Sequence, residues 1–397
     1  MTDAPHDTDV TLDGSLDAPL DVTDAAVDAD AGCACGAGRA CVDGGCDPAW
    51  IGLASTGAPA QRSHFAMVWT GREAIVWGGL NGETALGDGA RYDVDARRWT
   101  PITPTGAPSP RYDMAFAWTG SELIVWGGRR GDTALSDGAR YDPVTDRWRA
   151  LTNTGAPAVR SGSISVWTGS ELVVWGGFGA KTIVGDGARY EPVTDRWRAL
   201  PTAGAPSARR GAVATWTGSE VVLFGGVGDV GWIGDGARYD PVSDRWRALP
   251  RAGAPSQRAY AMCAWTGREV FVWGGFDDLG VLPVDGALYD PAGDRWRAIS
   301  TVNSPAPRSD TTAVWTGREV IFWGGASVDM PGPFPRSVPL ETGAAYSPDD
   351  SRWRELEAFG APSPRYAHGA VWTGSELLIW GGDGMLAAVS SGARLRP

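Results

Sequence analysis

Residues 62–99 read RSHFAMVWTGREAIVWGGLNGETALGDGARYDVDARRW, and this phrase recurs along the chain. It begins with Arg62, runs through apolar residues into Trp-Thr-Gly, and continues through a second apolar run into Gly78-Gly79. A Tyr and a Trp close it. A period of about 50 residues that carries four short apolar segments is typical of a radial β-array. The Trp-Thr-Gly motifs begin at Trp69, Trp118, Trp167, Trp216, Trp265, Trp315 and Trp372.

Each copy of the phrase predicts four antiparallel strands. In the first copy, residues 64–69 and 73–77 are apolar segments joined by Thr70-Gly71, a pair suited to a tight hairpin turn. A variable loop (80–87) separates them from a third strand at 88–92, and Trp99 opens the fourth. Four short strands with tight turns form one blade of a β-propeller.

These motifs resemble Kelch repeats, in which a diglycine closes the second strand and six residues separate a Tyr from a Trp. Six copies match fully, and in the seventh Leu395 stands at the Tyr position. The resemblance covers residues 50–397 and implies an all-β, seven-bladed Kelch-type propeller. The diglycines occupy residues 78–79, 127–128, 176–177, 225–226, 274–275, 324–325 and 381–382. The pairs are Tyr92/Trp99, Tyr141/Trp148, Tyr190/Trp197, Tyr239/Trp246, Tyr289/Trp296 and Tyr346/Trp353.

The fourth strand of the seventh copy is found at the other end of the chain. Trp50 lies one period before Trp99, and both are followed by Thr-Gly-Ala-Pro at the same distance. We therefore predict that residues 50–54 form the outer strand of the blade that residues 365–395 supply. Such pairing removes an open seam with unpaired backbone groups.

Two segments precede the propeller. Residues 1–49 hold eleven Asp against one Arg, and residues 1–32 lack any hydrophobic period, so we expect a disordered, Asp-rich tail and acidic linker. No basic and apolar leader is visible. Residues 33–49 form a Cys-rich segment in which disulfides, a metal site and free thiols all remain open. We favour disulfides and thus an extracytoplasmic or cell-surface location. The cysteines are Cys33, Cys35, Cys41 and Cys46.

Charge and hydropathy argue against nucleic-acid binding and against a membrane-spanning segment. Of the net charge of −12, the propeller carries only about −2, which gives no electrostatic case for nucleic acid. No apolar run approaches the roughly 20 residues of a transmembrane segment. The sequence shows no oligomerisation signal, and we expect a monomer.

The loops between second and third strands differ in length and content, whereas the turns at the opposite end of the blades barely vary. Variable loops on a rigid scaffold usually carry binding. Both charge signs together with aromatic residues favour a non-enzymatic interaction protein with a protein or glycan partner, although ordinary solvated loops would look the same. Trp232 stands out because packing does not require it there. The candidate loop contacts are Arg129, Arg130, Phe178, Trp232 and Phe334.

An Arg stands seven residues before each Trp-Thr-Gly motif, where a ring of guanidinium groups at the channel mouth could bind an anion. The alternative is that each Arg pairs within its blade with the acid that opens the third strand. Only Arg308 and Arg365 lack that acid, which makes them the stronger binding candidates. The other members of the ring are Arg62, Arg111, Arg160, Arg209 and Arg258.

The sequence gives little support for an enzymatic activity. Only three His are present, and the register predicts that His64 and His368 face opposite ways, so we expect no shared metal. We assign no catalytic residue and no cofactor. Some Kelch propellers act on small sugars, so a mutarotase or an oxidase is the alternative that the resemblance implies.

Overall fold

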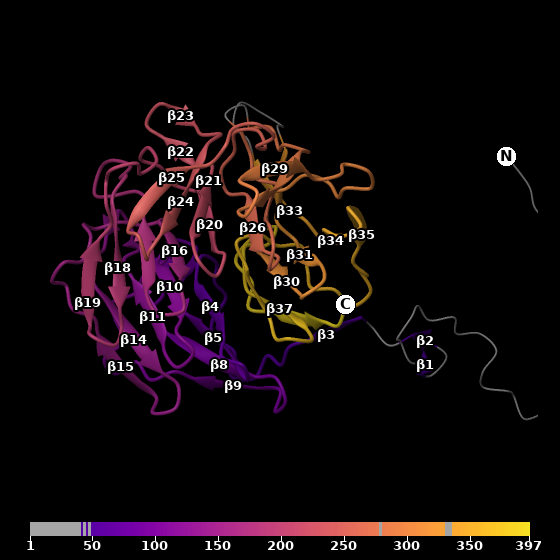
Figure 1. Cartoon of the computed structure of the whole chain (residues 1–397). Coiled ribbons are helices and arrows are strands. Elements are labelled where there is room, and N and C mark those ends of the chain that lie inside the picture. The colour runs from indigo at the N-terminus through magenta and orange to yellow at the C-terminus, as the bar shows by residue number, and fades with distance from the viewer. Residues whose placement is uncertain (1–40, 43–44, 47–48, 278–279, 330–335) are drawn as a thin grey trace, which may run out of the picture. The chain divides into compact units, whose positions relative to one another are not determined.

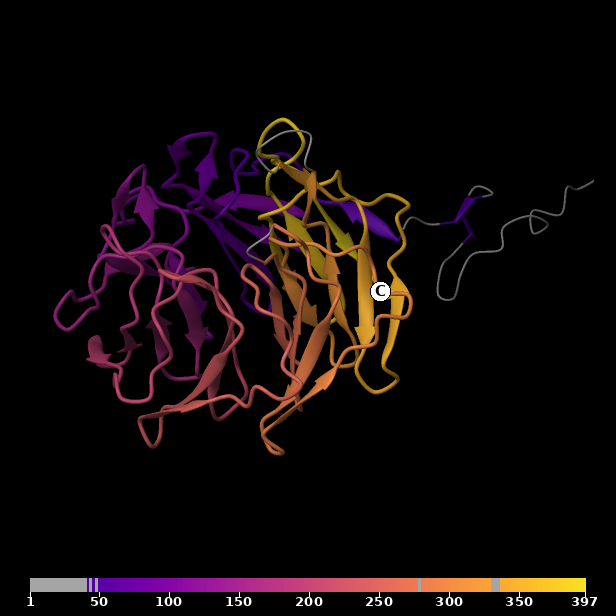
Figure 2. The ribbon, with the colours of Figure 1, turned by 90° about the horizontal axis from the view of Figure 1, so that it is seen from above.

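The computed structural model describes residues 41–42, 45–46, 49–277, 280–329 and 336–397. It divides the chain into two units, Met1–Asp47 and Pro48–Pro397. The second unit contains seven four-stranded antiparallel sheets set radially around an axis, as Figures 1 and 2 show. The fold is therefore the seven-bladed propeller that the repeats predict. The predicted tail, Cys33, Cys35 and Phe334 lie outside the described residues.

Six blades use consecutive segments of chain, with the first strand innermost. Blade one contains β4 (Ala66–Trp69), β5 (Glu73–Trp77), β8 (Gly89–Asp93) and β9 (Arg98–Pro101). Blade two contains β10 (Ala115–Trp118), β11 (Leu123–Trp126), β14 (Gly138–Asp142) and β15 (Arg147–Ala150). Blade three contains β16 (Ile164–Trp167), β17 (Leu172–Trp175), β18 (Gly187–Glu191) and β19 (Arg196–Ala199).

The next three blades follow the same order. Blade four contains β20 (Val213–Trp216), β21 (Val221–Phe224), β24 (Gly236–Asp240) and β25 (Arg245–Ala248). Blade five contains β26 (Met262–Trp265), β27 (Val270–Trp273), β28 (Gly286–Asp290) and β29 (Arg295–Ala298). Blade six contains β30 (Ala313–Trp315), β31 (Val320–Trp323), β34 (Gly343–Ser347) and β35 (Arg352–Glu355).

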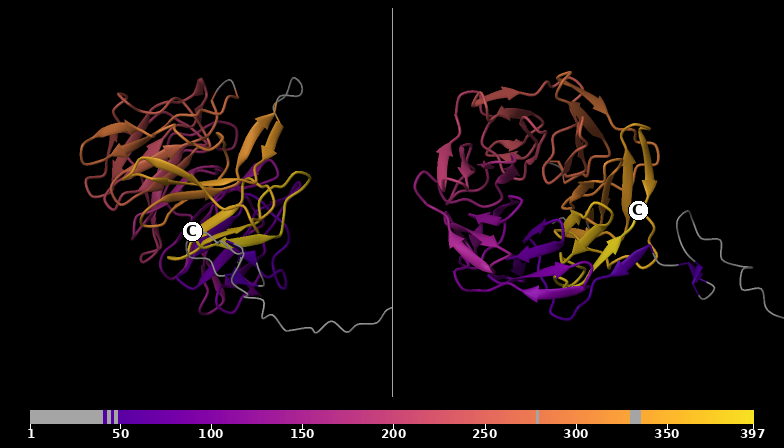
Figure 3. Two further views of the ribbon diagram at one scale, coloured as in Figure 1. Left: turned by 90° about the vertical axis from the view of Figure 1, so that its right-hand side faces the viewer. Right: turned by 60° about the horizontal axis from the view of Figure 1, so that its bottom comes forward.

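Blade seven joins the two ends of the propeller. It contains β36 (Gly369–Trp372), β37 (Leu377–Trp380), β38 (Gly392–Leu395) and β3 (Trp50–Gly52). β3 runs antiparallel to β38, with Trp50 opposite Leu395 and Ile51 opposite Arg394. Figure 3 shows the strand in the colour of the first described residues completing the last sheet. The predicted closure is confirmed, with a strand two residues shorter than expected.

Tryptophan pairs fill the wedges between blades. The aromatic residue that ends each second strand contacts the Trp of the fourth strand in the next blade, with ring centroids 4.8–5.7 Å apart. Such aromatic contacts add to the free energy gained by burial. The repeat spacing of the Trp residues is thus a packing requirement. The pairs are Trp77/Trp148, Trp126/Trp197, Trp175/Trp246, Phe224/Trp296, Trp273/Trp353, Trp323/Trp50 and Trp380/Trp99.

The diglycines connect each blade to the next through the backbone. The second glycine of each pair donates its N–H to the carbonyl of the repeat Arg of the following blade, as from Gly79 to Arg111 over 2.8 Å. Gly382 of blade seven donates in the same way to Arg62 of blade one, so the ring of contacts closes. Both glycines of every pair have positive φ, which explains why this motif does not vary.

The loops after the second strands are more ordered than the sequence suggests, since four of them form small hairpins. These are β6 (Leu80–Asn81) with β7 (Thr84–Ala85), β12 (Arg129–Arg130) with β13 (Thr133–Ala134), β22 (Val227–Gly228) with β23 (Gly231–Trp232), and β32 (Ala326–Asp329) with β33 (Arg336–Pro339). In the first unit, β1 (Cys41–Val42) pairs with β2 (Gly45–Cys46). Among the described residues there is no helix of a length and hydropathy that would cross a bilayer.

Candidate ligand-binding site at the propeller axis

Seven residues encircle the axis at one end of the propeller, each two positions after the repeat Arg. All seven have φ between 49° and 64°, although five are not glycine. Non-glycine residues in this left-handed region cost free energy and gather at functional sites. Backbone hydrogen bonds link six of the seven neighbouring pairs, and the bond from His64 N–H to the Ala367 carbonyl joins blade one to blade seven. The residues, here called the axial ring, are His64, Asp113, Gly162, Gly211, Tyr260, Asp310 and Ala367.

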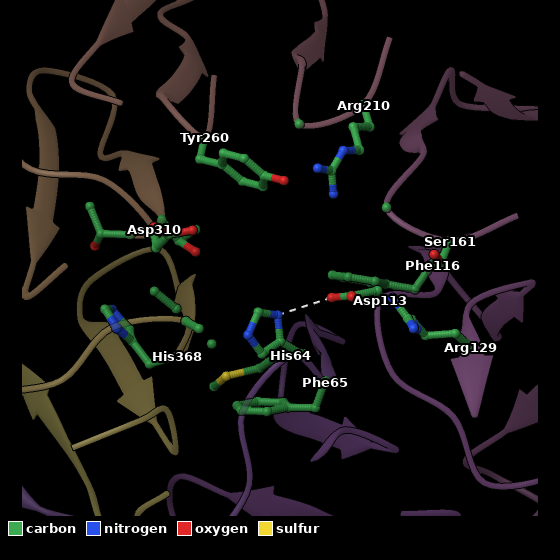
Figure 4. A pocket seen from close by; sticks show the side chains of 18 of the residues that line it. His64, Phe65, Asp113, Phe116, Arg129, Ser161, Arg210, Tyr260, Asp310 and His368 are labelled. Atoms are coloured by element: carbon green, nitrogen blue, oxygen red, sulfur yellow. Dashed lines mark hydrogen bonds and ion pairs between the residues drawn. The ribbon is translucent and has the colours of Figure 1, made fainter. Parts of the chain in front are cut away.

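The axial ring lines a cavity of about 790 Å³ at the end of the axis where the variable loops emerge (Figure 4). This volume lies in the range of small-molecule sites. A second set of lining residues directly follows the diglycines, because that position forms a β-bridge to the residue after the repeat Arg. Arg129 and Phe178 reach the cavity in this way. Aromatic walls are added by Phe65 and Phe116.

Two acidic side chains, Asp113 and Asp310, line the cavity on either side of His64 (Figure 4). The Nδ1 atom of His64 lies 2.9 Å from Oδ1 of Asp113, and each of these side chains is about one-third exposed. Asp310 accepts a 2.7 Å hydrogen bond from the hydroxyl of Ser309. Burial raises the pKa of the Asp310 carboxyl, and the nearby Asp113 adds to this, while Ser309 and His64 oppose it.

Burial alone would lower the pKa of His64, but the hydrogen bond and charge of Asp113, with Asp383 and Asp310, raise it above its ordinary value. In an NMR pH titration of the imidazole signals, we therefore expect Asp113→Asn to lower the pKa of His64. Because the folded pKa is raised, the His64 contribution to stability is complete below about pH 6.5 and is lost as the pH rises through the folded value. An unchanged His64 titration in the variant would contradict this assignment.

His368 differs sharply from His64. It is 5% exposed, lies beside Gly324 of blade six, and neither ring nitrogen has a hydrogen-bond partner. Burial, with the charge of Arg365, lowers its pKa to about 3. The two imidazoles contact different blades, as predicted: His64 bonds to Asp113 of blade two, whereas the His368 ring lies against Gly324 of blade six. His64 precedes β4 and has φ of 55°, so its direction follows from this backbone conformation and not from the strand register.

Tyr260 and Arg210 occupy another part of the cavity wall (Figure 4). The Tyr260 ring stacks on Phe276 at 5.3 Å and lies over Gly211, where a Cβ atom would come within 2.9 Å of it. The glycine at 211 is therefore needed for this placement. The Arg210 guanidinium lies 5.8 Å from the Phe178 ring centroid.

The repeat Arg residues have a structural role, because each one bonds to several groups within its own blade. Arg62 shows the pattern: it donates to the carbonyls of Gly78 and Asp88 and to the Asp88 carboxylate, which is 3.0 Å away. The predicted pairing with the acid of the third strand is present in all five blades that have this acid. All seven Arg residues are at most 1% exposed, and none lines the cavity. Anion binding by the ring stays a prediction.

Arg308 and Arg365 use hydroxyls where the acid is missing. They donate to Thr342 Oγ1 and Ser391 Oγ over 3.1 and 3.0 Å, and burial lowers the pKa of each to about 10. The structure thus confirms that they are the less neutralised pair.

Of the predicted loop contacts, Arg129 and Phe178 line the cavity. Trp232 does not, but it packs on Phe276 at 4.9 Å, behind Tyr260. Arg130 is exposed on β12. Contacts of these residues with a partner stay predictions.

Sequence reasoning missed Asp113, Arg210, Tyr260 and Asp310 as site residues. A signal was available, because the position two after the repeat Arg changes from blade to blade while the motifs around it repeat. Within the described part of the chain, no three His, Cys, Asp or Glu side chains gather in a way that could hold a metal ion.

The family model of the KLHDC2/KLHL20/DRC7 Kelch-repeats domain matches residues 48–177 and 154–325. The chain belongs to the Kelch-repeat family. Among curated proteins, none matches it significantly. The Kelch propeller fold points to a role in protein interaction, and this family member keeps its repeat framework while varying the residues at the axis.

Proposed function

We propose that this Kelch propeller is a non-enzymatic binding protein that holds a protein or glycan partner on its loop face, with the cavity at the centre of contact. One observation carries the proposal. The residues two positions after the repeat Arg, which differ from blade to blade, converge on a single cavity, while the repeated Trp and Arg side chains hold the blades together. A rigid scaffold with variable residues at one end is the usual arrangement of a binding site.

The test is a protein array and a glycan array probed with the purified chain and three variants. Arg210→Ala and Phe178→Ala remove side chains from the cavity wall, whereas Val193→Ser changes a side chain that is 90% exposed in the turn between β18 and β19. We expect each cavity variant to weaken the parent's interactions by about tenfold or more, as removal of a central contact does. Equal binding by all four forms would refute the proposal.

Display outside the cytoplasm is a further part of this proposal. Cys41 and Cys46 lie opposite each other in the β1–β2 pairing, and four cysteines within fourteen residues suit an oxidising compartment. We expect the four thiols to react with maleimide only after reduction, which mass spectrometry would detect. Four thiols that react without reductant in protein exported by its native host would contradict it.

A small-sugar enzyme is the second candidate, because the His64–Asp113 pair could transfer a proton at the cavity surface. A mutarotase would accelerate the exchange between anomers of a reducing sugar, and this is visible by NMR. Loss of that acceleration in Asp113→Asn would favour the enzyme, and its absence in the parent protein would exclude this activity for the sugars tried.

A further inference from the structure

Several polar side chains of the cavity have no partner in the described protein. The hydroxyls of Tyr260, Ser161 and Thr312 make no hydrogen bond there. A hydroxyl both donates and accepts, so this wall fits a ligand whose groups do the same. His368 also borders the cavity, but its two ring nitrogens are closed off from solvent and its ring lies against Gly324 of blade six.

The charges that line the cavity nearly cancel. Asp113 is paired with His64, and Arg129 lies 3.5 Å from Asp132. The two that remain are Asp310 and Arg210, which are of opposite sign. An anionic ligand would be attracted by Arg210 but repelled by Asp310. A ligand with an ammonium group would be attracted by Asp310 but repelled by Arg210. An uncharged ligand with hydroxyl groups can donate to Asp310 and accept from Arg210 without either cost.

Beside Met67, Ala367 and Ala370, the apolar part of the lining consists of aromatic side chains, two of which pack on other rings. Phe65 packs edge-on against Trp380 at 5.4 Å, and Tyr260 is backed by Phe276. Phe116 and Phe178 complete the set. Rigid aromatic faces among a few polar groups suit a ligand with flat apolar C–H surfaces and hydroxyls around its edge.

We propose that the cavity binds an uncharged saccharide, with room for one or two pyranose rings. The inference rests on the proposed function and selects the glycan class of partner for the site at the axis. The ring faces lie against the aromatic side chains, and the hydroxyls bond to Asp310, Tyr260 and Arg210.

The experiment compares sugars that share a ring but differ in charge. Glucose, glucosamine and glucuronate form one neutral, cationic and anionic series, and galactose and mannose with their amino and acid derivatives form two more. Binding to the full chain is measured by saturation-transfer NMR and calorimetry. We expect one neutral sugar to saturate, and its charged derivatives to bind about tenfold or more weakly, because a mismatched polar group stays unpaired.

Two conservative variants locate the site. Tyr260→Phe removes one hydroxyl and Asp310→Asn removes one charge, and we expect each to weaken the neutral sugar about tenfold. Val193→Ser, which changes an exposed side chain that does not line the cavity, should leave affinity unchanged. Unaltered melting temperatures would show that all three variants are folded.

Three results would overturn the inference: no neutral sugar saturates, a charged derivative binds more tightly than its neutral parent, or both cavity variants bind like the parent protein. Its failure is distinguishable from failure of the proposed function. If the cavity variants lose an array partner while no sugar binds, the interaction role stands and the saccharide is wrong. If a sugar binds but no array partner depends on the cavity, the saccharide inference stands and the proposed interaction role is wrong.

Discussion

Deletion of residues 50–55 is expected to lower the melting temperature of the propeller more than any single substitution outside the closure. The deletion removes β3, so β38 keeps only β37 as a partner and its outer edge becomes a row of unpaired backbone groups. It also removes Trp50, which is 1% exposed, contacts the Trp323 ring at 4.8 Å, and donates to the Glu357 carbonyl over 2.7 Å.

The size of the effect follows from burial. Truncation of one buried Trp to Ala costs about 3–5 kcal/mol, which is a large fraction of the roughly 5–15 kcal/mol that stabilises a typical domain. The deletion adds the loss of strand pairing to this. Trp50→Ala should therefore destabilise strongly, and the deletion should destabilise further.

A peptide spanning residues 48–60 supplies the control. Added to the truncated chain, it should raise the melting temperature with increasing concentration, because a ligand that binds only the folded state stabilises it by mass action. The same peptide with Trp50→Ala should have little effect. A truncated chain that melts within about 2 °C of the parent, or that ignores the peptide, would contradict a role for β3 in holding the ring closed.

The sequence predicts the fold well because the packing requirement is itself repeated. The Trp of the fourth strand recurs at each wedge, so its displaced copy, Trp50, is enough to indicate the closure. The sequence also predicts the pairing of Arg62 with Asp88, as the alternative to anion binding, because both positions recur together. Contacts that recur in every blade therefore leave a repeated pattern in the sequence.

The site is harder to predict because its residues are those that differ from one repeat to the next. Asp113 and Asp310 are far apart in sequence, and only the ring geometry brings both to one cavity. A strand register does not predict the left-handed backbone at these positions, so it could not show that His64 and Asp113 meet at the axis. The missing acids favour Arg308 and Arg365 as binding residues, yet their guanidinium groups are buried inside the blades.

Gly177→Ala is expected to destabilise the propeller strongly. Gly177 is the second glycine of blade three, has φ of 98°, and donates to the Arg209 carbonyl of blade four over 2.9 Å. A Cβ atom there would lie 2.7 Å from the Ser161 carbonyl oxygen and 2.9 Å from the Ser163 nitrogen. Since both neighbours are backbone atoms of the path leading to the axis, neither can move without disturbing the axial ring.

Gly169→Ala is the matched control for this substitution. Gly169 has φ of 96°, nearly the same backbone conformation, but a methyl group added there, in the turn between β16 and β17, would meet nothing within 4 Å. It should carry only the conformational cost of roughly 1–3 kcal/mol. Gly177→Ala carries the same cost together with an overpacking penalty of about 1–3 kcal/mol or more. The difference is measured by chemical denaturation of both variants. Equal destabilisation would mean that conformation alone, and not close contact between blades, fixes the diglycine.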